Sequence, residues 1–110
     1  GGFHYTLGFD NRPAITHKIW WPVTEAIGAA AFLHALTPDP FYEAWYRTCW
    51  DFAASHLIDL ANGGWFPELG QDLKPVDLFF TGKSDIYHAL QACLIPLFPA
   101  TGSLMQAIEA

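Results

Sequence analysis

Charged residues are scarce in this sequence, and positive charge is the scarcest. Only 15% of the 110 residues are charged, with five Lys and Arg against eleven Asp and Glu, for a net charge of −6. The few basic residues are scattered and form no stripe, so we do not expect nucleic-acid binding. Hydrophobic residues make up 52%, more than a small free-standing domain can bury. We therefore expect apolar surfaces that are covered by the rest of a longer chain or by a homo-oligomer.

Long hydrophobic runs are also lacking. The longest covers residues 27–33, well short of the roughly 18 residues that a membrane helix needs, so we expect no membrane partner. The sequence shows no signal-peptide pattern and does not begin with Met, which we interpret as the internal start of a fragment. The two cysteines, Cys49 and Cys93, lie in apolar helical contexts. We predict two buried thiols in a reducing, cytoplasmic compartment.

Motifs that bind metals or nucleotides are missing as well. The sequence contains no HExxH, CxxC or GxSxG motif and no phosphate-binding loop. Each of these motifs positions ligands or backbone amides at a fixed spacing. Their lack gives no indication of a metal or a cofactor, so we predict none.

An internal repeat is the most informative feature that is present. The segments GGFHYTLGFDNRPAI and GGWFPELGQDLKPVD begin 62 residues apart and agree at six of fifteen positions. The matching pairs are Gly1 and Gly63, Gly2 and Gly64, Leu7 and Leu69, Gly8 and Gly70, Asp10 and Asp72, and Pro13 and Pro75. A fixed period of this kind indicates a repeat architecture.

Each repeat is predicted to open with a β-hairpin, residues 3–7 with 14–16 and residues 65–69 with 76–80, and to continue into helix. Residues 20–36 form a nearly uncharged segment that we expect to be a helix buried on all sides. Residues 40–60 have one polar face, and Asn62-Gly63 is a helix stop. Residues 84–95 follow the capping residues Ser84 and Asp85, and a short helix is expected at 103–109.

The alternation of buried and amphipathic helices predicts a double ring of inner and outer helices. The fold class is therefore all-α: a C-terminal fragment of an (α/α)6 barrel with short β-hairpins between helices. Six units of this period would need roughly 370 residues. Residues 1–110 hold fewer than two units and are expected to be one part of a single catalytic domain.

Two ionisable residues occupy equivalent places in the repeats. Glu25 and His88 are 63 residues apart, each near the start of an expected inner helix, so both should face the same rim. A histidine can take and give a proton near neutral pH, but His88 could also bond a backbone carbonyl in the core. Glu25 could pair with Lys18 or bind a hydroxyl group. Trp20 could stack on a sugar or pack in the core.

Three stretches carry a resemblance to a known family: residues 18–26 (KIWWPVTEA), residues 63–65 (GGW) and residues 82–97 (GKSDIYHALQACLIPL). Together they resemble the C-terminal third of the N-acylglucosamine 2-epimerase superfamily, and the last is similar to its mannose/sulfoquinovose isomerase branch. The resemblance implies an (α/α)6 barrel that moves a sugar proton at C2 without a metal. It implies that His88 is a catalytic acid/base, that Trp20 and Glu25 contact substrate, and that Glu68 is the nearest candidate for a hairpin-loop contact.

The implied reaction opens the sugar to its free carbonyl, removes the C2 proton and forms an enediol. Returning the proton to C1 gives aldose–ketose isomerisation, which the branch resemblance favours, and returning it to C2 from the other face gives epimerisation. The family's further histidines and arginine have no match here, so the chain alone is expected to lack a complete site. Two alternatives stay open: a glycoside hydrolase or lyase that uses Glu25 and Glu68, and a non-catalytic helical-repeat module.

Overall fold

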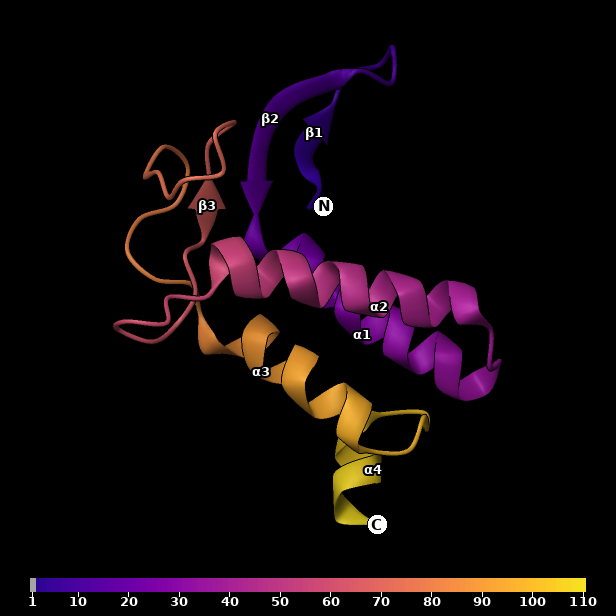
Figure 1. Cartoon of the computed structure of the whole chain (residues 1–110). Helices are drawn as coiled ribbons and strands as arrows, with labels where there is room; N and C mark the ends of the chain where they lie inside the picture. Colours follow the sequence, from indigo (N-terminus) through magenta and orange to yellow (C-terminus); the bar gives the residue numbers. More distant parts are fainter. Residues whose placement is uncertain (1) are drawn as a thin grey trace.

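The computed structural model describes residues 2–110, so the predicted match of Gly1 with Gly63 lies outside the described residues. Four α-helices and one three-stranded sheet make up the fold (Figure 1). The elements in chain order are β1 (His4–Leu7), β2 (Pro13–Ile19), α1 (Trp20–Leu36), α2 (Pro40–Phe52), the π-helix η1 (Ala53–Leu57), β3 (Glu68–Leu69), α3 (Ile86–Leu94), the 3-10 helix η2 (Ile95–Leu97) and α4 (Leu104–Glu109).

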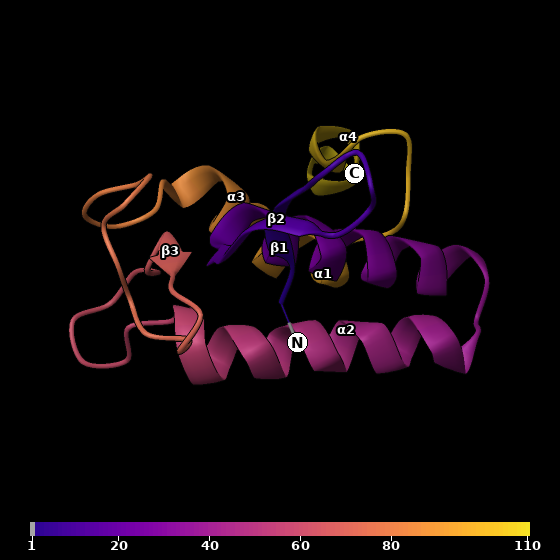
Figure 2. The same ribbon diagram turned by 90° about the horizontal axis from the view of Figure 1, so that it is seen from above.

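Helix α1 is the centre of the packing. It contacts α2 along one side and α3 along another (Figures 1 and 2). Ile19, Val23 and Ile27 are fully buried at this centre, together with Leu57 and Leu69. Burying each such side chain stabilises the fold by about 1.5–3 kcal/mol, so the sheet, the end of α2 and the start of α1 are held as one unit.

The predicted helix at 20–36 has the bounds of α1, but the prediction that it is buried on all sides is wrong for this chain. Trp21, Phe32, Leu33 and Leu36 are exposed. They lie on the side of α1 that the packed helices and the sheet do not cover. The described chain thus presents an apolar helix face that its own residues leave open.

Helix α2 ends earlier than the predicted 40–60. Regular α-helix stops at Phe52, five residues of π-helix follow, and Ile58 is extended. The backbone carbonyl of Leu57 accepts the amide of Phe66 instead of continuing the helix. Gly63 does adopt a left-handed φ of 79°, but it sits in a turn beyond the helix and does not terminate it.

The turns of the two predicted repeats have the same hydrogen bonds, which confirms the internal repeat. The amide of Gly8 donates to the carbonyl of Arg12, and 62 residues later the amide of Gly70 donates to that of Lys74. Each turn also carries an aspartate that accepts the amide two residues on. Even the left-handed residues correspond, Asn11 with φ of 60° and Leu73 with φ of 59°.

The two hairpins, however, differ. Strands β1 and β2 pair antiparallel as predicted, with β2 running on to Ile19. In the second repeat only Glu68–Leu69 is strand, and it pairs with β2, while Leu69 makes a single bridge to Pro75. Residues 76–80 form no strand: the Val76 amide donates to the backbone carbonyl of Glu68, but the amides of Phe79 and Phe80 donate to the Glu68 side chain and not to a ladder partner.

The C-terminal helices begin at side-chain caps. Asp85 caps α3 and Ser103 caps α4, each by accepting the backbone amide three residues ahead. The predicted burial of both cysteines holds for Cys49 and is wrong for Cys93, which is exposed on α3; both are free. No helix within residues 2–110 has the length and apolar character to cross a membrane.

Candidate active site

His88 and Glu25 lie next to each other where α1 and α3 begin. The His88 Nε2 atom is 3.8 Å from Oε1 of Glu25. Their side chains are 27% and 49% exposed respectively, so both can be reached from outside the packed core. The prediction that these two residues come together is confirmed by this distance, and the shared rim of a barrel stays a prediction.

A second carboxylate holds the other side of the His88 ring. Asp85 Oδ1 accepts the backbone amide of His88 at 3.2 Å and lies 3.3 Å from its Nδ1. Burial alone would raise the pKa of Asp85, but hydrogen bonds from His88 outweigh it and the pKa is lowered. Because an ionised carboxylate can only accept, Nδ1 carries the hydrogen and Nε2 faces Glu25. The sequence had indicated only a capping role for Asp85.

The side chains of the adjacent Trp20 and Trp21 point in different directions, as helical geometry requires. Trp20 is 6% exposed, and its ring meets those of Phe80 and His88 nearly at right angles. Its Nε1 has no hydrogen-bond partner among residues 2–110. Trp21 is 38% exposed and its ring centroid is 6.5 Å from that of His88. Sequence reasoning chose Trp20 as the substrate contact. Trp21 and Glu25 are four residues apart and therefore lie on one face of the helix, and this spacing was the signal for a second exposed ring near the site.

Glu68 occupies a buried position in β3. It is 0% exposed, its Oε1 lies 2.5 Å from Nδ1 of His17, and its Oε2 accepts the amides of Phe79 and Phe80. Burial would raise the pKa of this carboxyl, but the hydrogen bonds together hold it below its ordinary value. Both oxygens are therefore occupied by protein groups. A direct sugar contact by Glu68 remains a prediction, and this geometry supplies no free oxygen for it.

The extended segment before β3 connects the starts of the two site helices. The carbonyl of Pro67 accepts the amide of Trp20, the first residue of α1, at 3.2 Å. The carbonyl of Trp65 accepts the amide of Ser84, just before α3, at 2.9 Å. One short stretch of backbone thereby sets the relative position of α1 and α3, and with it the approach of Glu25 to His88.

An ion pair secures the same region from outside. Lys83 binds the carboxylate of Asp59, and its ammonium lies 4.2 Å from the centre of the Phe66 ring. Asp59 also accepts the amides of Ala61 and Asn62. The bond from Lys83, followed by that from the Asn62 amide, lowers the pKa of Asp59 strongly. The turn after η1 is thus tied to Lys83, two residues before the Asp85 cap of α3.

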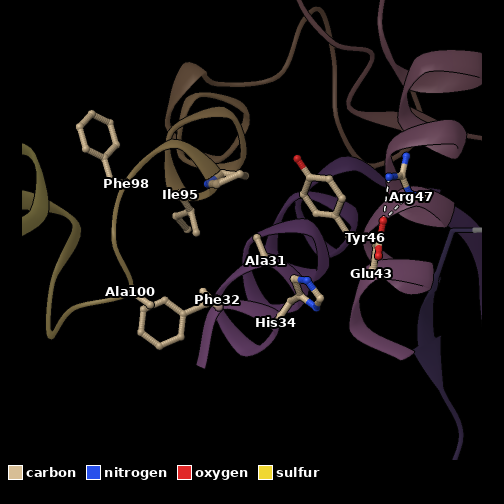
Figure 3. Close-up of a pocket in the computed structure, with 11 residues that line it drawn as sticks. Ala31, Phe32, His34, Glu43, Tyr46, Arg47, Ile95, Phe98 and Ala100 are labelled. Atoms are coloured by element: carbon tan, nitrogen blue, oxygen red, sulfur yellow. Dashed lines mark hydrogen bonds and ion pairs between the residues drawn. The ribbon is translucent and has the colours of Figure 1, made fainter. Parts of the chain in front are cut away.

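A cavity of about 330 Å³ lies at the opposite end of the helices (Figure 3). The end of α1, the first half of α2 and the segment after α3 line it, and the ion pair between Glu43 and Arg47 forms part of its wall. His88, Glu25 and Trp20 are not among its lining residues. In residues 2–110, no group of three or more His, Cys, Asp or Glu side chains is arranged to hold a metal ion.

Comparisons with known proteins agree on one family of sugar epimerases and isomerases. The model of the N-acylglucosamine 2-epimerase family matches residues 1–92. A D-mannose isomerase from Thermobifida fusca is 45% identical over 108 residues, which are 97% of this chain and 26% of that protein. The chain therefore spans about a quarter of the length of this curated relative.

Solved structures agree with the sequence comparison. A crystal structure of D-mannose isomerase superposes with a TM-score of 0.79 at 31% identity, covering 88% of this chain and 25% of that one. A cellobiose 2-epimerase from Spirochaeta thermophila superposes with a TM-score of 0.68 at 27% identity, covering 80% and 22%.

Proposed function

The chain belongs to the N-acylglucosamine 2-epimerase family, and on that premise we propose that it is the C-terminal part of a sugar isomerase that interconverts mannose-like or sulfoquinovose-like aldoses with ketoses. The similarity to a D-mannose isomerase over 97% of the chain supports this activity. The place of His88 between Glu25 and Asp85 is the single observation that carries it. The proposal applies to the complete protein, in the cytoplasm, and not to these 110 residues alone.

The architecture proposed for the complete protein is one (α/α)6 barrel. In it α1 and α3 are inner helices and α2 is an outer helix whose charged side, with Glu43 and Arg47, faces solvent. The exposed apolar side chains of α1 support this arrangement, because contiguous apolar surface is normally covered by other protein. The remaining helices of the barrel are the proposed cover, with a homo-oligomer as the alternative.

The chemistry proposed for His88 is proton transfer at C2 of the open-chain sugar. The adjacent carbonyl acidifies the C2–H bond, so a histidine base can remove the proton and leave an enediolate. The same imidazolium then returns the proton to C1, and transfer of the O2 hydroxyl proton to O1 yields the ketose. Asp85 supports this role, because a hydrogen on Nδ1 leaves the lone pair of Nε2 available as the base.

Substrate contacts are proposed for the side chains around His88. Glu25 is half exposed and can accept a hydrogen bond from a sugar hydroxyl. The indole of Trp20 borders the site with an unpaired N–H group, and the exposed ring of Trp21 offers a face for the sugar's C–H groups. Glu68 has no free oxygen, which argues against a hydrolase that uses Glu25 and Glu68 as its two carboxylates.

The test is an assay of the complete protein with D-mannose in heavy water. We expect D-fructose, with solvent deuterium incorporated at the carbon that accepts the proton. His88→Asn should lower turnover roughly 10²- to 10⁴-fold, as is usual for a general acid/base. His34→Ala is the matched control, since His34 lies at the far end of α1, where its Nδ1 is 3.2 Å from the carbonyl oxygen of Asp39. Unchanged turnover in His88→Asn would exclude the proposed role.

Epimerisation at C2 is the second candidate, and the superposition on a cellobiose 2-epimerase favours it. The two reactions share the first proton transfer and differ only in the carbon and face that receive the proton. In the same assay an epimerase converts D-mannose to D-glucose with deuterium at C2. A non-catalytic repeat module gives neither sugar and no exchange of the C2 hydrogen.

A further inference from the structure

The fully buried Glu68 and the partly buried His17 form a pair that the proposed reaction does not use directly. We propose that this pair positions His88: Glu68 fixes the backbone of Phe79 and Phe80, and the ring of Phe80 in turn sets Trp20, against which His88 rests. The inference rests on the proposed function of His88. It makes Glu68 a positioning residue and not a ligand for the sugar.

Hydrogen bonds to Glu68 hold the loop that precedes α3. Three donors converge on its carboxylate: the ring Nδ1 of His17 at 2.5 Å, and the amides of Phe79 at 2.8 Å and Phe80 at 3.1 Å. A buried carboxylate is costly unless such donors satisfy it. Because β3 is paired to β2, which leads directly into α1, the carboxylate is a fixed point to which the loop before α3 is attached.

Aromatic contacts connect that loop to the candidate site. The Phe80 ring centroid is 5.1 Å from that of Trp20 at an angle of 84°. The Trp20 ring is 5.9 Å from that of His88 at 89°. Edge-to-face pairs of this kind prefer a narrow range of geometries. A displacement of Phe80 therefore displaces Trp20 and removes the surface that supports one side of the imidazole.

His17 supplies the third hydrogen bond to the Glu68 carboxylate. In the β2–β3 register Glu68 stands opposite Ile19, and His17 projects from the same face of β2, two residues earlier. Its ring also packs on Phe79 with a centroid distance of 5.8 Å. Because the Glu68 carboxylate only accepts, Nδ1 of His17 is its donor. His17 thus closes the carboxylate on the side that the loop amides leave open.

The variants that test the proposal are made in the complete protein. Glu68→Ala removes all three bonds. Glu68→Gln keeps an oxygen for the two loop amides and an NH₂ group that can donate to Nδ1 of His17 in its other tautomer. His17→Ala leaves the loop bonds in place. Gln71→Ala is the matched control, because Gln71 bonds Thr16 at 2.6 Å and joins the same region of the sheet without touching Glu68.

The expected readout combines kinetics with the position of His88. Glu68→Ala should lower kcat roughly 10- to 100-fold, the range that small misplacement of a catalytic group produces, and KM should rise by less than kcat falls, because Trp20, a proposed substrate contact, moves with the loop. His17→Ala should show a smaller loss, and Glu68→Gln and Gln71→Ala should stay close to wild type. NMR signals of the His88 ring, in protein with labelled histidine, should shift in Glu68→Ala and not in Gln71→Ala.

Two results would overturn the inference. A rise in KM of ten-fold or more in Glu68→Gln, with unshifted His88 signals, would show that Glu68 touches the sugar. Unchanged kcat and unchanged His88 signals in His17→Ala and Glu68→Ala would show that the pair has no influence on the site. If the wild type neither isomerises nor epimerises sugars, the proposed function fails, and the His88 signals alone then decide whether the pair positions the ring. If Glu68→Ala does not fold, His17→Ala and Glu68→Gln give the decision.

Discussion

Three side chains decide the chemistry of His88 at the scale of single residues. Asp85 binds its Nδ1, Glu25 lies 3.8 Å from its Nε2, and Trp20 covers one side of the ring. Asp85 also caps α3 through the His88 amide. One carboxylate therefore both starts the helix and orients the residue one turn into it, so a change at Asp85 should affect stability and turnover separately.

Asp85→Asn separates these two effects. Asparagine caps helices as well as aspartate does, so the free energy of unfolding should change by less than about 0.5 kcal/mol. The amide is a weaker acceptor for Nδ1–H than a carboxylate, so kcat should fall by roughly ten-fold, since hydrogen bonds to charged groups contribute about 1.5–3 kcal/mol. Steady-state kinetics and urea unfolding measure both quantities. An unchanged kcat would contradict an orienting role, and Asp85→Ala, which loses the cap too, should be clearly less stable.

Glu25→Gln tests the proposed sugar contact. Loss of a charge-assisted hydrogen bond to a hydroxyl should lower kcat/KM roughly 10- to 100-fold. Stability should hardly change, because Glu25 is half exposed and its contact with His88, at 3.8 Å, is partly open to water. Steady-state kinetics together with urea unfolding distinguish a sugar contact by Glu25 from a purely structural pair with His88. A marked loss of stability with unchanged kcat/KM would assign Glu25 to the framework.

Sequence reasoning at this scale was effective where local structure decides the position. Glu25 and His88 follow equivalent turns and start equivalent helices, so a count along the repeat was enough to bring them together. Glu68 could not be assigned in this way. Its burial depends on Phe79 and Phe80 folding back over β3, which is a contact between segments that no local pattern encodes. The pairing of His17 across the sheet escaped for the same reason.

The same distinction appears at the scale of elements. The bounds of α1 follow from its own residues and were predicted correctly. The end of α2 does not, because the Leu57 carbonyl is taken by Phe66 and the helix gives way to a π-helix before residue 58. The missing second strand at 76–80 likewise results from amides that bond Glu68. Tertiary hydrogen bonds thus explain both errors.

Asp59→Asn tests the link between the turn after η1 and α3. The folded-state pKa of Asp59 is lowered by Lys83 and by the turn amides. Its contribution to stability is therefore fully present above the unfolded pKa of about 3.9, and it is lost as the pH falls through the lower folded value. We expect Asp59→Asn to be less stable than wild type at pH 7, with the difference shrinking on acidification below about pH 4. Urea unfolding at several pH values measures this, and a difference that persists at low pH would contradict it.

Gly28 sets how closely α1 approaches the segment after α3. A Cβ at this position would lie 2.9 Å from Cδ1 of Ile95. Gly28→Ala should be nearly neutral, because a gain in helix propensity of about 1 kcal/mol is offset by displacement of a flexible side-chain tip. Gly28→Leu should destabilise by about 1–3 kcal/mol through overpacking. Ala29→Leu, at an exposed position on the same helix, is the control and should leave the urea midpoint unchanged.

At the scale of the whole molecule, the candidate site and the cavity lie at opposite ends of the helices. The sheet stands over the starts of α1 and α3, where His88 lies (Figure 1). The cavity between α1 and α2 lies at the other end (Figure 3). Apolar composition predicted that other protein covers part of this chain, and α1 and α3 carry the exposed apolar side chains that such a cover would bury. The proposed barrel would supply further site residues from outside the 110 residues, and no pattern within them could identify those residues.

The final prediction concerns these 110 residues produced on their own. Large apolar side chains are exposed on α1 and on α3, among them Trp21, Phe32, Leu36, Ile86 and Leu90. Contiguous apolar surface of this kind drives association in water, so the isolated chain should self-associate and bind a hydrophobic dye. It should also show no detectable mannose isomerisation, because the resemblance assigns further catalytic groups to earlier helices. Size-exclusion chromatography with light scattering, followed by assay after mixing with the separately produced remainder of the protein, tests both points. A monomeric and active 110-residue chain would contradict the barrel proposal, whereas recovery of activity on mixing would support assembly of the two parts into one active barrel.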